Sequence, residues 1–199
     1  MLISRLKLKN WRNFKNADVA LRERAYIIGP NASGKSNLLD VFRFLRDVAR
    51  PDGGGLQKGV KDRGGIAKLR CLLARKDPEV LIEVDIAEGV DEEPAWRYTL
   101  AFKGEAKGLH RVPVSQERVE DLRTKKVLVN RPDSEDRKDR DRLTQSCLEQ
   151  IGTNRRFRDV ASFLASISGC SGWFSRPPAR HLNPCGGGSG ACPNVWSCS

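Results

Sequence analysis

Eight residues near the N-terminus have the types and the spacing that suit phosphate binding. The stretch Gly29-Pro30-Asn31-Ala32-Ser33-Gly34-Lys35-Ser36 matches the pattern G-x-x-x-x-G-K-[ST] at each fixed position. Glycines let such a loop turn its backbone N–H groups inward around an anion. Lys35 supplies a point charge for the β- and γ-phosphates, and the Ser36 hydroxyl suits Mg²⁺, which prefers oxygen ligands. The pattern therefore predicts a site for a nucleoside triphosphate with Mg²⁺.

The flanking residues predict the elements that would hold this loop. The run "AYIIG" (25–29) is short, apolar and ends in glycine, which is typical of a strand buried on both faces. After the loop, Leu38, Phe42, Leu45 and Ala49 fall on one face of a helix, which Pro51 ends. The positive end of this helix would point at the same anion.

Strand patterns occur on both sides of the loop. Leu6 and Leu8 alternate with lysines, as in a half-buried strand, and "ADVAL" is a second short candidate. Residues 51–67 are rich in glycine and predict a mobile loop. Residues 68–130 then hold five strand-like segments without long helices between them, which predicts an antiparallel meander. These segments are "KLRCLLAR", "EVLIEVDIAE", "AWRYTLAFKG", "HRVPVSQERVE" and "KKVLVNRP".

The last part of the chain divides into helical and atypical segments. "RPDSEDRKDRDR" (131–142) has balanced charges and predicts a solvated loop, and "LTQSCLEQI" and "FRDVASFLASI" predict two helices within residues 134–167. Residues 168–199 contain no acidic residue and four of the six cysteines. We therefore divide the chain into residues 1–167, with an α/β fold, and a disordered tail of residues 168–199.

Composition bounds the partners. No run of 18 apolar residues is present, so the sequence predicts no membrane span, and no secretory signal is recognisable, which favours the cytoplasm. The net charge is +11, and the first 50 residues hold 11 Lys and Arg against 4 Asp and Glu. A basic surface of this kind favours polyanions, so DNA is a candidate partner.

The N-terminal residues select a family among the P-loop proteins. "ISRLKLKNWRNFKNADVAL" followed by "IIGPNASGKSNLLDVF" resembles the RecF/SMC-type branch of the ABC ATPases, and more narrowly the RecF-like AAA-type ATPases found beside Toprim nucleases or in OLD-like and other defence systems. The turn Asn10-Trp11-Arg12-Asn13-Phe14 stands for the "N-F-R-x-F"-like turn of that family, with Trp11 in place of the usual aromatic residue.

The resemblance implies several expectations for residues 1–167. The fold would be the N-terminal lobe of an ABC/SMC-type head with an antiparallel β-subdomain. The nucleotide would be ATP, bound with Mg²⁺ by residues 29–36 together with Asn37, and Arg12 would lie near it. Family members work as head-to-head dimers, so a second ATPase head is the expected partner, and the parent protein would act in DNA repair or defence.

Hydrolysis in this family needs motifs that the chain does not show. "VLIEVDIAE" is the only acid-tipped apolar run, but Glu83 and Asp85 alternate with apolar residues and so predict a strand with one wet face rather than a Walker B strand. "GGGSG" (186–190) lacks the Leu-Ser start of a signature motif, and His110 and His181 lie in no motif. Gln145 and Gln150 are both open as the Q-loop residue. The expectation is a truncated ATPase that binds ATP without appreciable turnover and has no catalytic residue of its own.

The tail and the function both leave alternatives open. The sequence after about Ser168 is either read out of frame or foreign to the fold; zinc binding lacks a C-x₂-C pair, and disulfides conflict with a cytoplasmic protein. For the function, a non-catalytic DNA-binding module and a different P-loop enzyme, such as a small kinase or a GTPase, are the alternatives. A GTPase would show an NKxD guanine reader, and a small kinase would need a parallel βαβ series.

Overall fold

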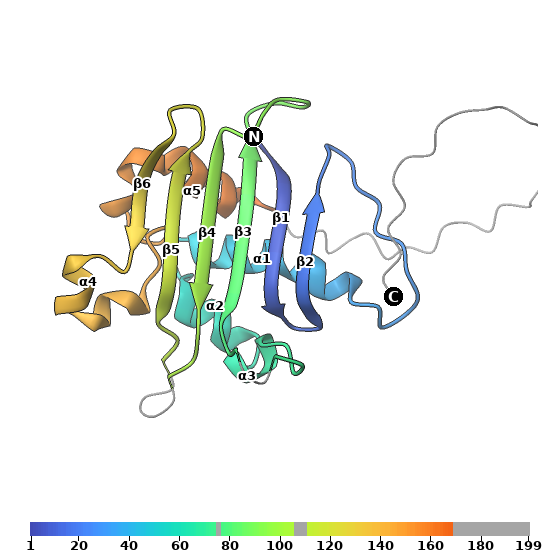
Figure 1. The fold of residues 1–199 in the computed structure, drawn as a ribbon, viewed down its shortest axis with the longest axis horizontal. Coiled ribbons are helices and arrows are strands. Elements are labelled where there is room, and N and C mark those ends of the chain that lie inside the picture. Colours follow the sequence, from blue (N-terminus) through green and yellow to red (C-terminus); the bar gives the residue numbers. More distant parts are fainter. Residues whose placement is uncertain (75–76, 106–110, 169–199) are drawn as a thin grey trace, which may run out of the picture.

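One six-stranded sheet forms the centre of the molecule (Figure 1). The computed structural model describes residues 1–74, 77–105 and 111–168. The strands are β1 (Leu2–Trp11), β2 (Phe14–Ala20), β3 (Val80–Ala87), β4 (Trp96–Phe102), β5 (Val114–Asp121) and β6 (Lys126–Arg131). Their order is β2-β1-β3-β4-β5-β6, and all neighbours pair antiparallel.

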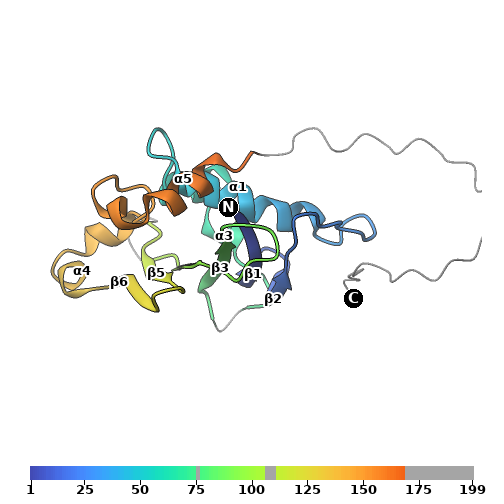
Figure 2. The same ribbon diagram turned by 90° about the horizontal axis from the view of Figure 1, so that it is seen from above.

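Helices cover one face of this sheet (Figure 2). The α-helices are α1 (Lys35–Ala49), α2 (Leu56–Asp62), α3 (Ile66–Leu69), α4 (Ser134–Lys138) and α5 (Arg158–Ser166), and the 3-10 helices are η1 (Arg140–Thr144) and η2 (Thr153–Phe157). α1 packs against both α2 and α5. The architecture is a two-layer α/β fold, which confirms the predicted fold class with its antiparallel β-subdomain.

The hydrophobic core lies between the sheet and α1. Leu6, Leu8 and Ile82 project from the sheet into it, and Val41 and Phe44 project from α1, all fully buried. The Phe44 ring lies 5.2 Å from the Trp11 ring and 5.5 Å from the Phe102 ring, between centroids. The alternation of leucine with lysine in β1 thus places the lysines on the opposite face of the sheet, as the sequence predicted.

Most of the predicted strands are confirmed, and two are wrong. The alternating N-terminal segment, "ADVAL" and the last four segments of the meander correspond to β1 to β6. "KLRCLLAR" does not form a named strand, because its first residues complete α3 and Arg70 makes only an isolated bridge to Trp11. Leu72 and Leu73 follow in a turn with side chains 80% and 77% exposed.

The strand predicted at residues 25–29 is also wrong. These residues are irregular, and Tyr26 and Ile28 are 72% and 62% exposed. A strand buried on both faces needs a neighbour to pair with, and none of the strands in the described residues pairs with this run. The apolar run therefore enters the phosphate loop without a partner in the described part of the chain.

The helix predictions divide in the same way. α1 ends before Pro51 as predicted, and α5 with η2 confirms "FRDVASFLASI", with Phe157, Val160 and Leu164 buried. The glycine-rich segment 51–67 holds α2 instead of a loop, because Leu56 and Val60 find core contacts. "LTQSCLEQI" forms no α-helix; its first two residues complete η1, and the others lie in turns whose polar groups bind the network described below.

The tail lies outside the described residues. The predictions for residues 169–199, including disorder, a change of reading frame, zinc and disulfides, concern that segment, as does His181. His110 falls in the second gap of the described ranges. Within the described ranges, Cys71 and Cys147 are free and buried.

Candidate functional site

The phosphate loop connects the irregular segment 25–28 directly to α1. Its backbone takes left-handed torsion angles at Ala32 (φ 67°) and Gly34 (φ 98°). Gly34 is the N-cap residue of α1, and no side chain caps the helix there. The torsion angle at Gly34 favours glycine, and a Cβ atom there would displace the side-chain amide of Asn13.

The start of α1 presents unused hydrogen-bond donors. The backbone N–H groups of Gly34, Lys35, Ser36 and Asn37 have no acceptor among the residues that the structure describes, and the first turn carries no acidic residue. The first intrahelical bond is that of the Leu38 N–H to the Gly34 carbonyl, at 2.9 Å. Free amides at a helix N-terminus, together with the helix dipole, form a site for an anion.

Lys35 lies over the loop. Its Nζ donates to the carbonyl oxygens of Gly29 (2.8 Å) and Pro30 (2.6 Å), and so closes the loop at its first two residues. The Ser36 hydroxyl has no partner within the described ranges. The loop thus combines a cation, free amides and a free hydroxyl within one turn of chain.

The turn between β1 and β2 supports the far side of the loop. Asn13 Nδ2 donates to the Ser33 carbonyl (3.4 Å), and Asn37 Nδ2 donates to Asn13 Oδ1 (2.8 Å). The indole Nε1 of the buried Trp11 donates to the Asn37 carbonyl (2.8 Å). The turn that suggested the family by sequence is therefore in direct contact with the phosphate loop.

Arg12 is held beside the loop by a carboxylate. Its Nε and Nη2 donate to Asp40 Oδ2 of α1 at 3.1 and 2.6 Å. Asp40 also accepts from Arg63 Nε, at 3.1 Å to each carboxylate oxygen. Sequence reasoning missed this cluster, although Asp40 lies four residues after Ser36 and therefore on the same side of α1.

The two carboxylates considered for a Walker B motif, Glu83 and Asp85, bind side chains of the sheet and not the phosphate loop. Asp85 accepts from Arg97 (2.6 and 2.8 Å), and Glu83 accepts from the Thr99 hydroxyl (3.2 Å). The pairing of Asp85 with Arg5 and of Glu83 with Lys7 places both on the sheet face opposite to α1. The hydrogen bond to Asp85 raises the pKa of Arg97, which is typical of a stable ion pair.

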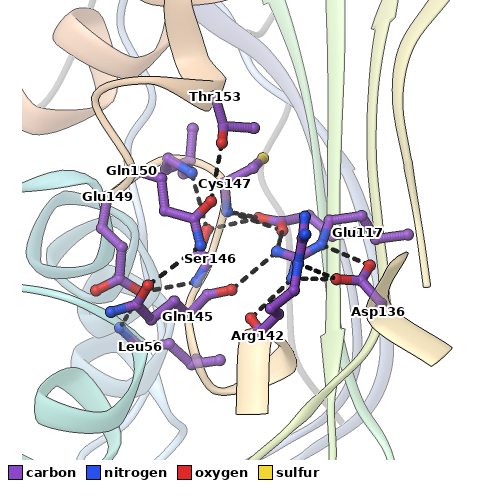
Figure 3. A network of polar contacts seen from close by, with 12 residues as sticks. Leu56, Glu117, Asp136, Arg142, Gln145, Ser146, Cys147, Glu149, Gln150 and Thr153 are labelled. Atoms are coloured by element: carbon purple, nitrogen blue, oxygen red, sulfur yellow. Dashed lines mark hydrogen bonds and ion pairs between the residues drawn. The ribbon is translucent and has the colours of Figure 1, made fainter. Parts of the chain in front are cut away.

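The two glutamines considered for the Q-loop lie at the other end of α1. Figure 3 shows Gln145 and Gln150 beside Glu149, whose Oε1 accepts the N–H of Leu56 at 3.3 Å. Leu56 starts α2, and the adjacent Gly55 N–H donates to the Asp47 carbonyl near the C-terminal end of α1. A helix of 15 residues separates the two regions by roughly 20 Å, so neither glutamine is placed to contact the loop here.

A buried ion-pair cluster lies in the same region (Figure 3). Glu117 accepts from Tyr98 Oη (2.8 Å), from Arg131 Nη1 (3.1 Å) and from the Cys147 N–H (2.9 Å). Arg131 also binds Asp136, at 2.9 and 3.0 Å. Glu117, Arg131 and Asp136 are buried, whereas the other residues of the segment 131–142 are exposed, as predicted for a solvated segment. The segment is not a plain loop, however, because it contains α4 and the start of η1. The cluster joins β5, β6 and α4 and makes no contact with the phosphate loop.

The donors at the loop fit ATP and Mg²⁺. Four free amides and Lys35 match the acceptor oxygens of the phosphates, and Gly34 leaves the backbone open to close approach. Ser36 would supply one oxygen to the metal, which usually takes the others from phosphates and water. Within the described residues no cluster of three or more His, Cys, Asp or Glu forms a separate metal site.

Comparison with known proteins agrees with this geometry. A family model described as "AAA domain, putative AbiEii toxin, Type IV TA system" matches residues 25–155, and one described as "P-loop containing region of AAA domain" matches residues 3–45. The second match begins in β1 and ends in α1 and so contains the loop and the turn that supports it.

Curated relatives also match part of the chain. The DNA replication and repair protein RecF of Roseiflexus castenholzii is 31% identical over 111 residues, which is 52% of this chain and 28% of that protein. RecF of Clavibacter sepedonicus is 33% identical over 43% of this chain and 21% of its own length, and RecF of Chlamydia caviae is 50% identical over 23% and 12%. The matched stretches thus span at most about a quarter of these relatives. None of the helices in the described ranges is long and apolar enough to cross a membrane.

Proposed function

The chain belongs to the family of P-loop AAA domains whose model matches residues 25–155, and it resembles RecF-like ATPases. From this premise we propose that it binds ATP with Mg²⁺ at residues 29–37. The observation that supports this most strongly is the set of free amides at the start of α1 beside Lys35 and Ser36. In this proposal the amides and Lys35 hold the β- and γ-phosphates, and Ser36 holds the metal. Bound Mg²⁺ would neutralise phosphate charge and orient the triphosphate.

We propose further that this chain holds nucleotide without appreciable turnover. Hydrolysis needs a carboxylate that orients the attacking water. In the described part of the chain, Glu83 and Asp85 are engaged on the far face of the sheet, and Asp40 is shared by two arginines. A water-activating carboxylate and a signature motif would therefore come from protein outside these residues, as in a truncated ATPase.

The partners follow from the same premise as proposals. The relatives are named as DNA replication and repair proteins, and the family description names a toxin system, so a parent protein in DNA repair or defence is the best-supported role. Such a parent would act on DNA in the cytoplasm, and a second ATPase head would complete the site as a homodimer. The net charge of +11 favours a polyanion partner.

Calorimetric titration of the chain with ATP and Mg²⁺ tests the nucleotide proposal. We expect saturable binding, and Lys35→Ala should weaken it by roughly 10- to 100-fold, since a hydrogen bond to a charged group contributes about 1.5–3 kcal/mol. Lys61→Ala is the matched control, because Lys61 is exposed in α2 and away from the loop, and it should leave binding unchanged. Absence of ATP binding, or equal binding by the Lys35 variant, would refute the proposal.

Two alternatives make different predictions. A DNA-binding module would bind DNA with a steep dependence on salt and no dependence on ATP. A GTPase would prefer GTP over ATP in competition. A small kinase agrees poorly with a described sheet whose neighbouring strands all pair antiparallel, because that class of enzyme is built on parallel βαβ units.

A further inference from the structure

Asp40 lies at the junction of three elements that meet beside the phosphate loop. We propose that Asp40 is a positioning residue, which holds the Arg12 guanidinium where it can bind the phosphates of a nucleotide. This inference rests on the proposed nucleotide site and adds to it a residue that does not itself touch the ligand. Its basis is the pattern of contacts around Asp40, Arg12 and Arg63.

Asp40 fixes one edge of the Arg12 guanidinium and leaves the other edge free. Both Nε and Nη2 of Arg12 donate to the single oxygen Oδ2, whereas Nη1 has no acceptor within the described ranges. A planar guanidinium held by one edge is fixed in orientation, so its remaining N–H groups have a defined direction. The side chains of Arg12 and Asp40 are 25% and 17% exposed, so water reaches the pair only partly.

Arg63 holds Asp40 in place independently of Arg12. Its Nε donates to both oxygens of Asp40, its Nη1 to the Gly59 carbonyl and its Nη2 to Asp47. The guanidinium also lies 5.2 Å above the centre of the Phe44 ring, and the side chain is only 8% exposed. Arg63 is thus fixed on all sides, and it fixes the carboxylate that in turn orients Arg12.

Arg12 is close enough to the loop for this orientation to matter. The next residue, Asn13, contacts Ser33 and Asn37 directly. Asp40 lies four residues after Ser36, which is about 6 Å along the helix axis. An arginine anchored between these two points lies within one side-chain length of a phosphate held by the α1 amides.

If Asp40 acted only through its charge, it would have the opposite effect on anion binding from an Asp40 that positions Arg12. The guanidinium groups of Arg12 and Arg63 both face the carboxylate of Asp40, so one positive charge is in excess around Asp40. Removal of the Asp40 charge would raise this excess and, by attraction alone, tighten binding of an anion. If Asp40 positions Arg12, its removal weakens binding instead.

The test is a double-mutant cycle on ATP–Mg²⁺ affinity, read by calorimetry in the absence of turnover. Asp40→Asn and Arg12→Lys should each weaken binding by roughly tenfold, since each removes a guanidinium fixed by a charge-assisted bond. The double variant should lose no more than either single variant, because both changes remove the same interaction. Asp40→Glu, which keeps the charge, should recover part of the affinity.

Asp47→Asn is the matched control. Asp47 is the other carboxylate of Arg63 and makes no contact with Arg12, so this variant should lower the melting temperature as Asp40→Asn does and leave ATP affinity unchanged. Tighter or unchanged binding by Asp40→Asn, additive losses in the double variant, or an equal loss in Asp47→Asn would overturn the inference. If the wild-type protein did not bind ATP at all, the nucleotide proposal itself would be overturned.

Discussion

Gly34 is the residue on which the shape of the phosphate loop depends most directly. It combines a left-handed torsion angle with the close approach of Asn13. Gly53 has a similar torsion angle (φ 66°) but nothing within 4 Å of an added Cβ atom. Alanine at Gly53 would therefore strain only the backbone angle, whereas alanine at Gly34 would also displace Asn13.

We expect Gly34→Ala to lower the free energy of unfolding more than Gly53→Ala, which should cost about 1 kcal/mol for the left-handed angle alone. Gly34→Ala should also abolish or strongly weaken ATP binding, since Asn13 must move away from the loop. Chemical denaturation and calorimetry of both variants measure the two effects. Equal stabilities, or full ATP affinity in Gly34→Ala, would contradict this account of the loop.

The residues of the loop were predictable, but their supports were not. The fixed spacing of Gly29, Gly34, Lys35 and Ser36 carries its own chemistry, so the sequence alone predicts the anion site. Asn13 contacts the loop from 20 residues away, and Arg63 reaches Asp40 across 23. Such contacts depend on how a hairpin turn and a second helix pack on α1, which no local pattern in the sequence encodes.

At the scale of elements, the sequence predicted periodic segments better than irregular ones. The strands of the meander alternate apolar and polar residues and pair with their neighbours in sequence, so both their existence and their order were predictable. The pairing of β1 with β3 joins segments far apart in the sequence, so it was not predictable. Residues 25–28 have the composition of a strand, but a strand also needs a partner, and composition does not show whether one is present.

Two oppositely charged residues, Arg131 and Asp136, are buried within the otherwise exposed segment 131–142. Burial alone would raise the pKa of Asp136, but hydrogen bonds from Arg131 and from the Asp133 N–H, with the charge of Arg131, outweigh it and hold that pKa below its ordinary value. Burial likewise opposes the charge of Arg131, yet Asp136 and Glu117 raise its pKa. Asp136 therefore stays charged, despite its burial, because of Arg131 and the Asp133 N–H.

We expect Arg131→Met to lower the free energy of unfolding at pH 7 by about 3–5 kcal/mol, because it removes the cation that the buried carboxylates of Glu117 and Asp136 share. Arg118→Met is the control: Arg118 pairs with Glu120 on the open face of the sheet and is 42% exposed, so its loss should cost less than about 1 kcal/mol. Denaturant titration of both variants measures the difference.

The ion pair of Arg131 with Asp136 predicts that the stability of the protein depends on pH. A carboxyl whose pKa is lowered on folding stabilises the protein above its unfolded pKa of about 3.9, and this contribution is lost as the pH falls through the lower folded value. Wild-type stability should therefore decline below about pH 4, and the gap to Arg131→Met should narrow there as the unpaired carboxyls take up protons. A gap that stays constant from pH 7 to pH 3 would contradict the role of the ion pair.

At the scale of the whole molecule, the sheet presents one face to the helices and one charged face outward. On the outer face, Arg5 pairs with Asp18, Arg97 with Asp85, and Arg118 with Glu120. This face is largely neutralised by its own acids, so it is a poor candidate for DNA. The excess positive charge that favours a polyanion lies in other parts of the chain, among them Arg155 and Arg156, which are exposed in η2 and have no acidic partner within the described ranges.

The four free amides at the start of α1 are proposed to bind the phosphates of ATP. NMR can test this most directly, by following hydrogen exchange of these amides with and without ATP and Mg²⁺. We expect slowed exchange at residues 34–37 on addition of nucleotide, and a smaller change in Lys35→Ala at the same nucleotide concentration. The Leu56 amide at the start of α2, which already binds Glu149, should not respond. Nucleotide binding that leaves the exchange of residues 34–37 unchanged would contradict the account.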